Sequence, residues 1–365
     1  MSHDLFAGAS RVASYTDAED PSDVAGLSPG AARRTLRPVL ISDAMPDSSP
    51  APSAVQGTAD TSAVPESSPS DQTSHPSRGR RRFPLGGRRA RTDDKRDLAD
   101  ELAAIRQATW TRSVNVVVAS PKGGIGRTPV TLALAGTLGH VRGGYVAALE
   151  ATAERGDLAD LAEGSPPRGI SELLEVAETL DSAGAVGGYA SPQSSNIDVF
   201  ASTGPRGPLT EQDVHELRGV LNRHYRITVT DTGADQHAAA FVAAVTTADA
   251  VVIPVTATRS ALAAASRTLM HLADHGRADL LGRVSAIVTH DGGWQDKDFA
   301  ASLPDRLTAL GVRHVVHVPY DLELRRGDEI TLERLSKESQ RAWVSVAAHV
   351  VDCLRDAPDL PPTRP

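Results

Sequence analysis

The chain has 365 residues, of which 40% are hydrophobic, and a formal net charge of −8. The length allows one large domain with an extension, and a single cysteine, Cys353, excludes intramolecular disulfides and cysteine-rich metal sites within one chain. No apolar run reaches the about 18 residues of a membrane span and no secretory leader pattern is present, so the sequence predicts a cytoplasmic protein without a transmembrane segment.

The first 77 residues differ in composition from the rest of the chain. They contain 15 Ser and 9 Pro, and their 10 acidic side chains outnumber 4 basic ones. They show almost no sustained apolar periodicity, so they cannot bury enough apolar surface to offset the entropy of ordering them. We therefore expect residues 1–77 to form a disordered, acidic tail.

A basic linker is predicted next, from Arg78 to Arg96, where nine Lys or Arg side chains stand against two Asp. Such a segment is a candidate for contact with a polyanion, whether DNA, anionic lipid or an acidic protein. A merely solvated, flexible linker fits the same composition. The remaining residues are acidic overall, so any polyanion contact is expected in this linker.

Strands and helices alternate along the rest of the chain. Apolar residues at helical spacing, from Leu98 to Ile105, predict a linking helix within 97–112. Buried strands are expected at 114–119, 145–149, 197–201, 227–231, 250–255, 284–289 and 314–318. Helices are expected at 130–138, 169–179, 213–224, 260–275, 299–310 and 335–354.

This alternation predicts the fold class. Near-continuous Val, Ile and Ala in the strands indicates a mostly parallel sheet with both faces covered by helices. We therefore expect a doubly wound α/β domain over 113–357, followed by a short tail at 358–365. Ligands of such sheets bind at the carboxyl ends of the strands, where Glu150 and Asp231 fall.

A glycine-rich loop follows the first strand. It reads Pro121-Lys122-Gly123-Gly124-Ile125-Gly126-Arg127-Thr128, between a buried strand and a helix, so its backbone N–H groups suit a phosphate. The usual phosphate loop begins with Gly and has Lys in the seventh position, where this chain has Pro121 and Arg127. An ordinary strand-to-helix turn is the simpler alternative.

The loop resembles that of the ParA/MinD family of P-loop ATPases. The family version, Lys-Gly-Gly-x-Gly-Lys-Thr, is matched by Lys122, Gly123, Gly124, Gly126 and Thr128. The resemblance implies ATP and Mg²⁺ as cofactors, with Thr128 as a Mg²⁺ ligand. It also implies a nucleotide-dependent homodimer, in which Lys122 reaches the nucleotide of the partner subunit. The chain looks most like actinobacterial MinD-like proteins, some of which are associated with type VII secretion.

Two later segments extend the resemblance. Thr230-Asp231-Thr232-Gly233 resembles the family's Walker B and switch II segment, which implies that Asp231 holds Mg²⁺ and that Gly233 approaches the γ-phosphate. Pro319-Tyr320-Asp321 resembles the segment that borders the base. Taken alone, Asp231 would as readily be a turn or helix-capping residue.

Two departures concern hydrolysis. Arg127 replaces the lysine that contacts the β- and γ-phosphates, and its planar guanidinium is not equivalent to an ammonium. Thr152 stands where ParA and MinD carry the carboxylate that positions the attacking water, and a hydroxyl cannot act as a base at neutral pH. Glu150 is either a Mg²⁺-side group or a solvated carboxylate at a strand end. We therefore expect binding of nucleotide with very slow hydrolysis.

Two classes of function fit the sequence. The first is a nucleotide-dependent switch whose homodimer positions or regulates a larger machine through an unidentified protein partner. The second is a pseudo-ATPase scaffold that keeps the fold without turnover. A metabolic P-loop enzyme is disfavoured because no substrate residues are recognisable, and the acidic, proline-terminated last helix disfavours MinD-like membrane attachment.

Overall fold

The computed structural model describes residues 5–6, 87–166, 168–293 and 295–359, which all belong to one unit. The tail predicted at 1–77 lies outside the described residues except for Leu5 and Phe6. The basic linker is described only for the backbone from Gly87 onward, and residues 360–365 lie outside as well. The predicted domain boundaries and the polyanion contact of Arg78 to Arg96 therefore stay predictions.

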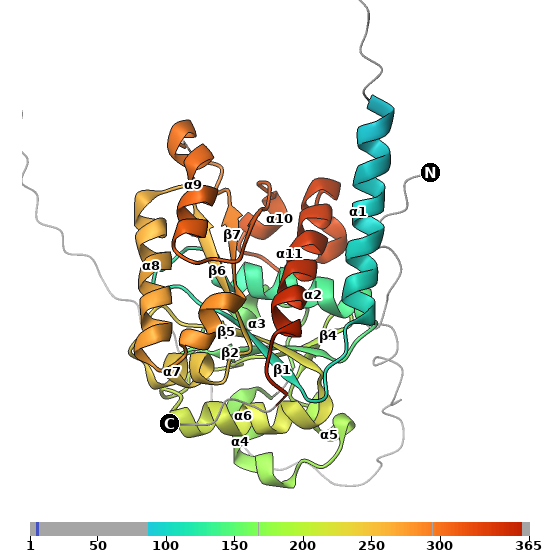
Figure 1. The fold of residues 1–365 in the computed structure, drawn as a ribbon. Helices are drawn as coiled ribbons and strands as arrows, with labels where there is room; N and C mark the ends of the chain where they lie inside the picture. Colours follow the sequence, from blue (N-terminus) through green and yellow to red (C-terminus); the bar gives the residue numbers. More distant parts are fainter. Residues whose placement is uncertain (1–4, 7–86, 167, 294, 360–365) are drawn as a thin grey trace, which may run out of the picture. The chain divides into compact units, whose positions relative to one another are not determined.

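An eight-stranded sheet forms the centre of the unit (Figure 1). Its strand order is β3-β4-β2-β5-β1-β6-β7-β8, and every neighbouring pair is parallel except β3 with β4. The strands are β1 Val114–Val118, β2 Val146–Ala151, β3 Ser191–Pro192, β4 Ile197–Phe200, β5 Ile227–Thr232, β6 Ala250–Thr256, β7 Val284–Thr289 and β8 His314–His317.

Helices cover both faces of the sheet. One face packs against α4 Ile170–Val176, α5 Ala183–Gly187, α6 Glu211–His224, α7 Ala239–Thr246, α8 Arg259–Asp274 and α9 Lys297–Ala309. The other packs against α1 Gly87–Gln107, α2 Arg127–Arg142, α3 Leu158–Leu161, α10 Leu322–Arg325 and α11 Lys337–Arg355. In Figure 1, α1, α2 and α11 lie side by side on this second face.

Alternation along the strands explains the two cores. Val117 of β1 belongs to the first apolar cluster, whereas its neighbours Val116 and Val118 belong to the second. Since side chains alternate across a strand, a strand between two helical layers is buried on both faces, so apolar residues predominate and a polar one such as Asn115 is hydrogen-bonded. The predicted fold class, a mostly parallel, doubly wound α/β sheet, is confirmed.

Leu5 and Phe6 are placed on the core of this unit. Phe6 is buried, and its ring meets that of His140 edge to face, with the centroids 4.8 Å apart. These two residues of the predicted tail therefore add apolar surface to the core, and the disorder predicted for residues 1–77 stays a prediction. Among the described helices, none is long and apolar enough to cross a membrane.

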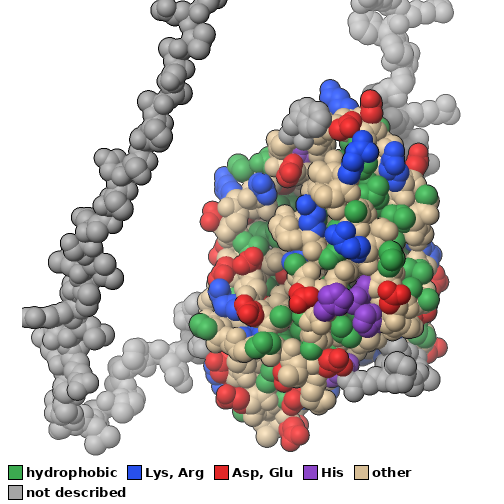
Figure 2. Space-filling model, turned by 90° about the vertical axis from the view of Figure 1, so that its left-hand side faces the viewer, with side chains coloured by type: hydrophobic (Ala, Val, Ile, Leu, Met, Phe, Trp, Pro, Cys, Tyr) green, Lys and Arg blue, Asp and Glu red, His purple; other side chains and the backbone are tan. Residues whose placement is uncertain are grey.

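Histidine side chains gather on the side of the unit that carries α8 (Figure 2). His271 of α8 is buried, with its ring 5.2 Å from that of Phe241 and 3.9 Å from that of His275. Burial, with His275 and His237 adding to it, lowers the pKa of His271 to about 4. The folded state therefore resists protonation of this ring.

We expect His271 to make the protein sensitive to acid. Because its pKa is lower folded than unfolded, its contribution to stability is present above about pH 6.5 and is lost as the pH falls towards 4. Replacement by glutamine, His271→Gln, should reduce the fall in melting temperature between pH 7 and 4.5, measured by calorimetry. His275→Gln, at a more exposed ring, serves as the control and should retain most of the fall. Equal falls in wild type and His271→Gln would contradict this assignment.

Candidate functional site

The glycine loop lies between the end of β1 and the start of α2, as the sequence predicts. Gly124 and Gly126 have φ of 67° and 90°, which L side chains rarely adopt. A Cβ added at Gly123, Gly124 or Gly126 would meet nothing within 4 Å, so open space lies beside the loop. The loop therefore has the shape of an open cradle at the N-terminus of a 16-residue helix.

Arg127 points its guanidinium back at the loop. Its Nη1 donates to the carbonyl oxygens of Ser120 and Lys122, both at 2.8 Å, and its Nε donates to that of Thr232, also at 2.8 Å. Burial lowers the pKa of Arg127, and Asp231 partly opposes this effect. The guanidinium of Arg127 thus connects the loop to the end of β5 by hydrogen bonds. A lysine ammonium would donate hydrogen bonds in a different geometry.

Thr128 and Asp231 meet directly. The hydroxyl of Thr128 donates to Oδ2 of Asp231 at 2.7 Å, while Oδ1 of Asp231 is buried without a hydrogen-bond partner among the described residues. Burial raises the pKa of Asp231 to about 7, although the Thr128 hydroxyl and Arg127 work against this rise. A cation placed here would satisfy the unpaired oxygen and favour the ionised carboxylate.

Glu150 lies next to Asp231, its partner in the β2–β5 register, and is fully buried. Its Oε1 accepts from Ser202 and, at 3.1 Å, from Nη2 of Arg206. The alternative of a solvated carboxylate at a strand end is therefore wrong. Its Oε2 is buried and has no hydrogen-bond partner among the described residues. The hydroxyl of Thr128 donates to Asp231 and not to Glu150.

Arg206 also anchors the segment that follows β2. Its guanidinium donates to the carbonyl oxygens of Ala153, Thr152 and Glu154 at 2.8 to 3.0 Å. The hydroxyl of Thr152 accepts from Arg206 at 3.1 Å and donates to the carbonyl of Glu154. Thr152 is thus engaged within its own loop, at the place where a water-positioning carboxylate was predicted to be missing.

Lys122 and Gly233 have different neighbours: Lys122 contacts the start of α8, and Gly233 lines a cavity. The ammonium of Lys122 donates to Oγ of Ser260 at 3.3 Å, and no ion pair joins Lys122 to a carboxylate within the described residues. Gly233 lines a cavity of about 340 Å³ together with Arg127, Thr152 and Asp157. Arg127, the neighbour of Thr128, and Gly233, two residues after Asp231, therefore line the same cavity.

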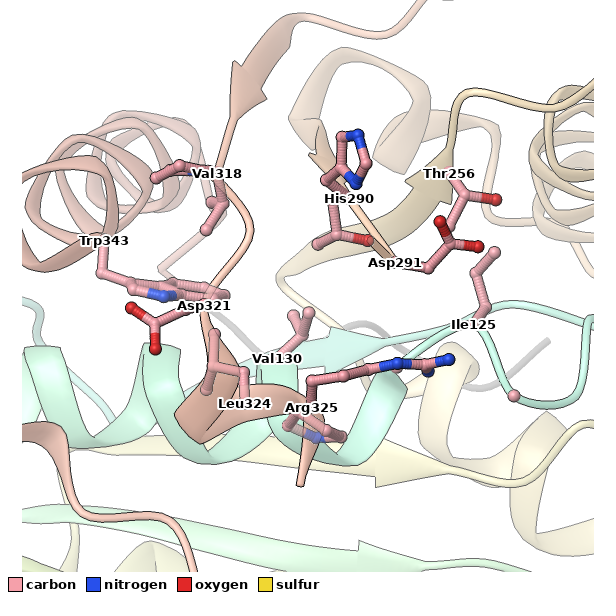
Figure 3. Close-up of a pocket in the computed structure, with 15 residues that line it drawn as sticks. Ile125, Val130, Thr256, His290, Asp291, Val318, Asp321, Leu324, Arg325 and Trp343 are labelled. Carbon is pink, nitrogen blue, oxygen red and sulfur yellow. The ribbon is translucent and has the colours of Figure 1, made fainter. Parts of the chain in front are cut away.

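A second, smaller cavity of about 80 Å³ lies on the other side of the loop (Figure 3). Its wall comes from Gly124 and Gly126, from His290 and Asp291 after β7, and from elements near the C-terminus, as the full set shows: Gly124, Ile125, Gly126, Pro129, Val130, Thr256, Thr289, His290, Asp291, Val318, Pro319, Asp321, Leu324, Arg325 and Trp343. Since ligand pockets usually measure about 300–1,000 Å³, a base would need movement of the rim or would lie partly outside.

Pro319 and Tyr320 differ in their positions relative to this cavity. Pro319 lines it, together with Gly124 and Gly126 of the phosphate loop. Tyr320 is 43% exposed and does not line it; its ring lies 6.3 Å from that of His290. The predicted base-bordering segment is therefore near the loop, with its tyrosine turned outward in this structure.

The residues present fit a nucleotide with Mg²⁺. Thr128 supplies a hydroxyl and Asp231 a carboxylate with one unpaired oxygen, and Mg²⁺ commonly takes only one or two protein ligands beside phosphate and water oxygens. No cluster of three or more His, Cys, Asp or Glu that could hold a metal by itself occurs among the described residues. The donor set thus suits a metal that arrives with phosphate.

Sequence reasoning missed Ser202 and Arg206. They follow β4 in a loop with the sequence Ser202-Thr203-Gly204-Pro205-Arg206, in which nothing marks the arginine as a buried group. A signal was available only indirectly, because a carboxylate at the end of a central strand requires a partner when it is buried.

Two curated relatives match the chain, and no known family profile does. Both are the ESX-1 secretion-associated protein EspI of Mycobacterium tuberculosis, from strains CDC 1551 / Oshkosh and ATCC 25618 / H37Rv. Each is 26% identical over 247 residues, which are 66% of this chain and 36% of the relative. The chain therefore aligns with about a third of the length of these relatives.

Solved structures with a similar fold include a ParA family ATPase from Chlorobium tepidum TLS, with a TM-score of 0.49 and 17% identity over 66% of this chain and 97% of that one. The MinD cell division protein of Aquifex aeolicus has a TM-score of 0.49 and 18% identity, over 69% of this chain and 100% of that one. The cell division ATPase MinD of Pyrococcus furiosus has a TM-score of 0.48 and 19% identity, over 65% of this chain and 98% of that one.

Proposed function

We propose that the chain is a nucleotide-dependent switch of the ParA/MinD type, which binds ATP with Mg²⁺ and closes a homodimer. The observation that carries this proposal is the contact of Thr128 with Asp231 below an open glycine loop, with one carboxylate oxygen buried and unpaired. Bound Mg²⁺ would neutralise charge on the phosphates. Loop N–H groups would hold the phosphates, while Thr128 and Asp231 orient the metal side.

Slow turnover is part of the proposal. Thr152 is a hydroxyl engaged with Glu154 and Arg206 and cannot act as a base towards water, and Glu150 is fully buried with its charge paired to Arg206. Arg127 keeps a positive charge near the phosphates but is hydrogen-bonded to carbonyl oxygens. We therefore expect the protein to bind ATP but to hydrolyse it very slowly. Several turnovers per minute by the isolated protein would contradict this expectation.

The partner of this switch is proposed to belong to a secretion machine. The support is the 26% identity to a protein named as ESX-1 secretion-associated, over 66% of this chain. A second candidate, a pseudo-ATPase scaffold for the same machine, is favoured by the three hydrogen bonds that Arg127 already makes to the loop and β5.

Calorimetric titration of ATP and ADP into the full chain, with and without Mg²⁺, tests the switch. Mg²⁺ should strengthen ATP binding at least about tenfold, which is about 1.4 kcal/mol. Asp231→Asn should remove this gain and, without ligands, should raise the melting temperature because a buried carboxyl with a pKa of about 7 is replaced by a neutral group.

Asp305→Asn is the matched control, since Asp305 is exposed on α9 and lies outside the cavities beside the glycine loop. It should keep the Mg²⁺ effect of the wild type. Absence of nucleotide binding in the wild type and in Arg127→Lys would overturn the switch and favour the scaffold.

A further inference from the structure

A cavity of about 500 Å³ lies at the end of β1 opposite the phosphate loop. Its wall combines the segment before β1, one side of α6 and the turn before β6, and consists of Thr111, Arg112, Ser113, His215, Arg218, Gly219, Asn222, Arg226 and Thr247. Among the described residues this lining contains three arginines and no Asp or Glu. The volume is within the usual range for small-molecule sites, about 300–1,000 Å³.

Among the described residues, Asp249 is the carboxylate that forms an ion pair with this arginine group, through Arg112. Asp249 accepts from Nη1 and Nη2 of Arg112 at 2.9 and 2.6 Å and from the backbone N–H of Asn115 at 2.8 Å. Its charge is therefore committed to Arg112, and two further guanidinium groups line the cavity, those of Arg218 and Arg226.

Arg218 is the unusual member of the group. It is 6% exposed, and its Nε and Nη1 atoms have no hydrogen-bond partner within the described structure. The Ser113 hydroxyl, which lines the same cavity, is also buried and unpaired. Burial lowers the pKa of Arg218 to about 10, and Arg112 adds to this effect against Asp249. A buried cation with two unpaired donor atoms costs stability unless an anion supplies their partners.

We propose that this cavity is a second ligand site, which binds a phosphate dianion, free or as the terminal group of a small phosphomonoester, between Arg218, Ser113 and Arg226. Two guanidinium groups without a carboxylate on the cavity wall match the double charge of such a group. Phosphate oxygens accept several hydrogen bonds at once, as the unpaired donors of Arg218 and Ser113 require.

The test compares the wild type with Arg218→Met by thermal melting and calorimetric titration of inorganic phosphate into the full chain at constant ionic strength. Without phosphate, Arg218→Met should melt higher than the wild type, because a buried charge with two unpaired donor atoms is removed and Asp249 keeps its contacts with Arg112. With phosphate, the wild type should gain stability. The variant should bind at this site about 10- to 150-fold more weakly, the loss typical of one charge-assisted contact.

Controls separate this site from the phosphate loop and from bulk charge. Arg267→Met removes an exposed positive charge from α8 and should bind as the wild type does. Ser113→Ala, which keeps every charge, should weaken binding severalfold and serves if Arg218→Met does not fold. Binding at the phosphate loop is common to all these variants and cancels in the comparison.

The source of the phosphate is decided by a second titration with glycerol 2-phosphate. Tighter binding than that of inorganic phosphate assigns the site to an ester, the reverse assigns it to the free ion, and both support the site. The proposal is overturned by equal phosphate binding in wild type and Arg218→Met, by a lower melting temperature of Arg218→Met without phosphate, or by equal stabilisation with acetate.

Discussion

Arg206→Met is expected to lower the free energy of unfolding by about 3–5 kcal/mol, the usual effect of removing one member of a buried ion pair. Arg206 is 5% and Glu150 0% exposed in their side chains, with 3.1 Å between Nη2 and Oε1. Methionine fills a similar volume but leaves the Glu150 carboxylate with the Ser202 hydroxyl as its only remaining partner among the described residues. For a domain of this size, the melting temperature should fall by about 6–20 °C.

A double-mutant cycle with Glu150→Gln isolates the charge. Glu150→Gln alone should cost less than Arg206→Met, because Arg206 retains the carbonyl oxygens of Thr152, Ala153 and Glu154. In the Arg206→Met background, Glu150→Gln should restore part of the lost stability, since no buried charge then remains at this position.

Arg155→Met is the matched control on the same loop. Its ion pair with Asp160 is largely exposed, with side chains 36% and 52% accessible, so its loss should cost only about 0.2–1 kcal/mol. Similar melting temperatures for Arg206→Met and Arg155→Met would show that the buried pair contributes no more than a surface one.

The strand pattern made the fold predictable from sequence. Strands such as β1, whose five residues are all buried, carry no polar alternation and can only lie between two layers of helices. The start of the first long helix was less predictable: α1 begins at Gly87, whereas the sequence predicts a helix within 97–112. Apolar spacing indicates only the part of a helix that packs on the core, which in α1 begins at Leu98, and it does not show where the helix itself begins.

The glycine loop and Asp231 could be singled out from the sequence because each belongs to a short, contiguous motif. The Glu150–Arg206 pair could not, because its members are 56 residues apart and meet only through the β2–β4 register. The outward direction of the Tyr320 side chain could not be predicted either. The motif Pro319-Tyr320-Asp321 indicates where the backbone passes but not whether the tyrosine ring is exposed.

Lys122→Ala is expected to abolish ATP-dependent dimerisation while leaving monomer folding and ADP binding nearly unchanged. Lys122 is half-buried, and its ammonium contacts only a neutral hydroxyl, Oγ of Ser260 at 3.3 Å, among the hydrogen bonds of the described residues. Folding therefore loses little when it is removed. Sedimentation velocity with a slowly hydrolysed ATP analogue and Mg²⁺, on wild type and variant, measures the effect.

The expected size follows from symmetry. In a two-fold dimer each interface contact occurs twice, and a charge-assisted contact to phosphate is worth about 1.5–3 kcal/mol. Loss of both contacts should therefore weaken dimerisation about 150- to 20,000-fold. Ser260→Ala is the matched control, because it removes the hydroxyl and keeps the ammonium, and it should dimerise as the wild type does. Two results would contradict the proposed homodimer: a wild type that stays monomeric with the ATP analogue, or a Lys122→Ala variant that dimerises as well as the wild type. Either result would favour the pseudo-ATPase scaffold.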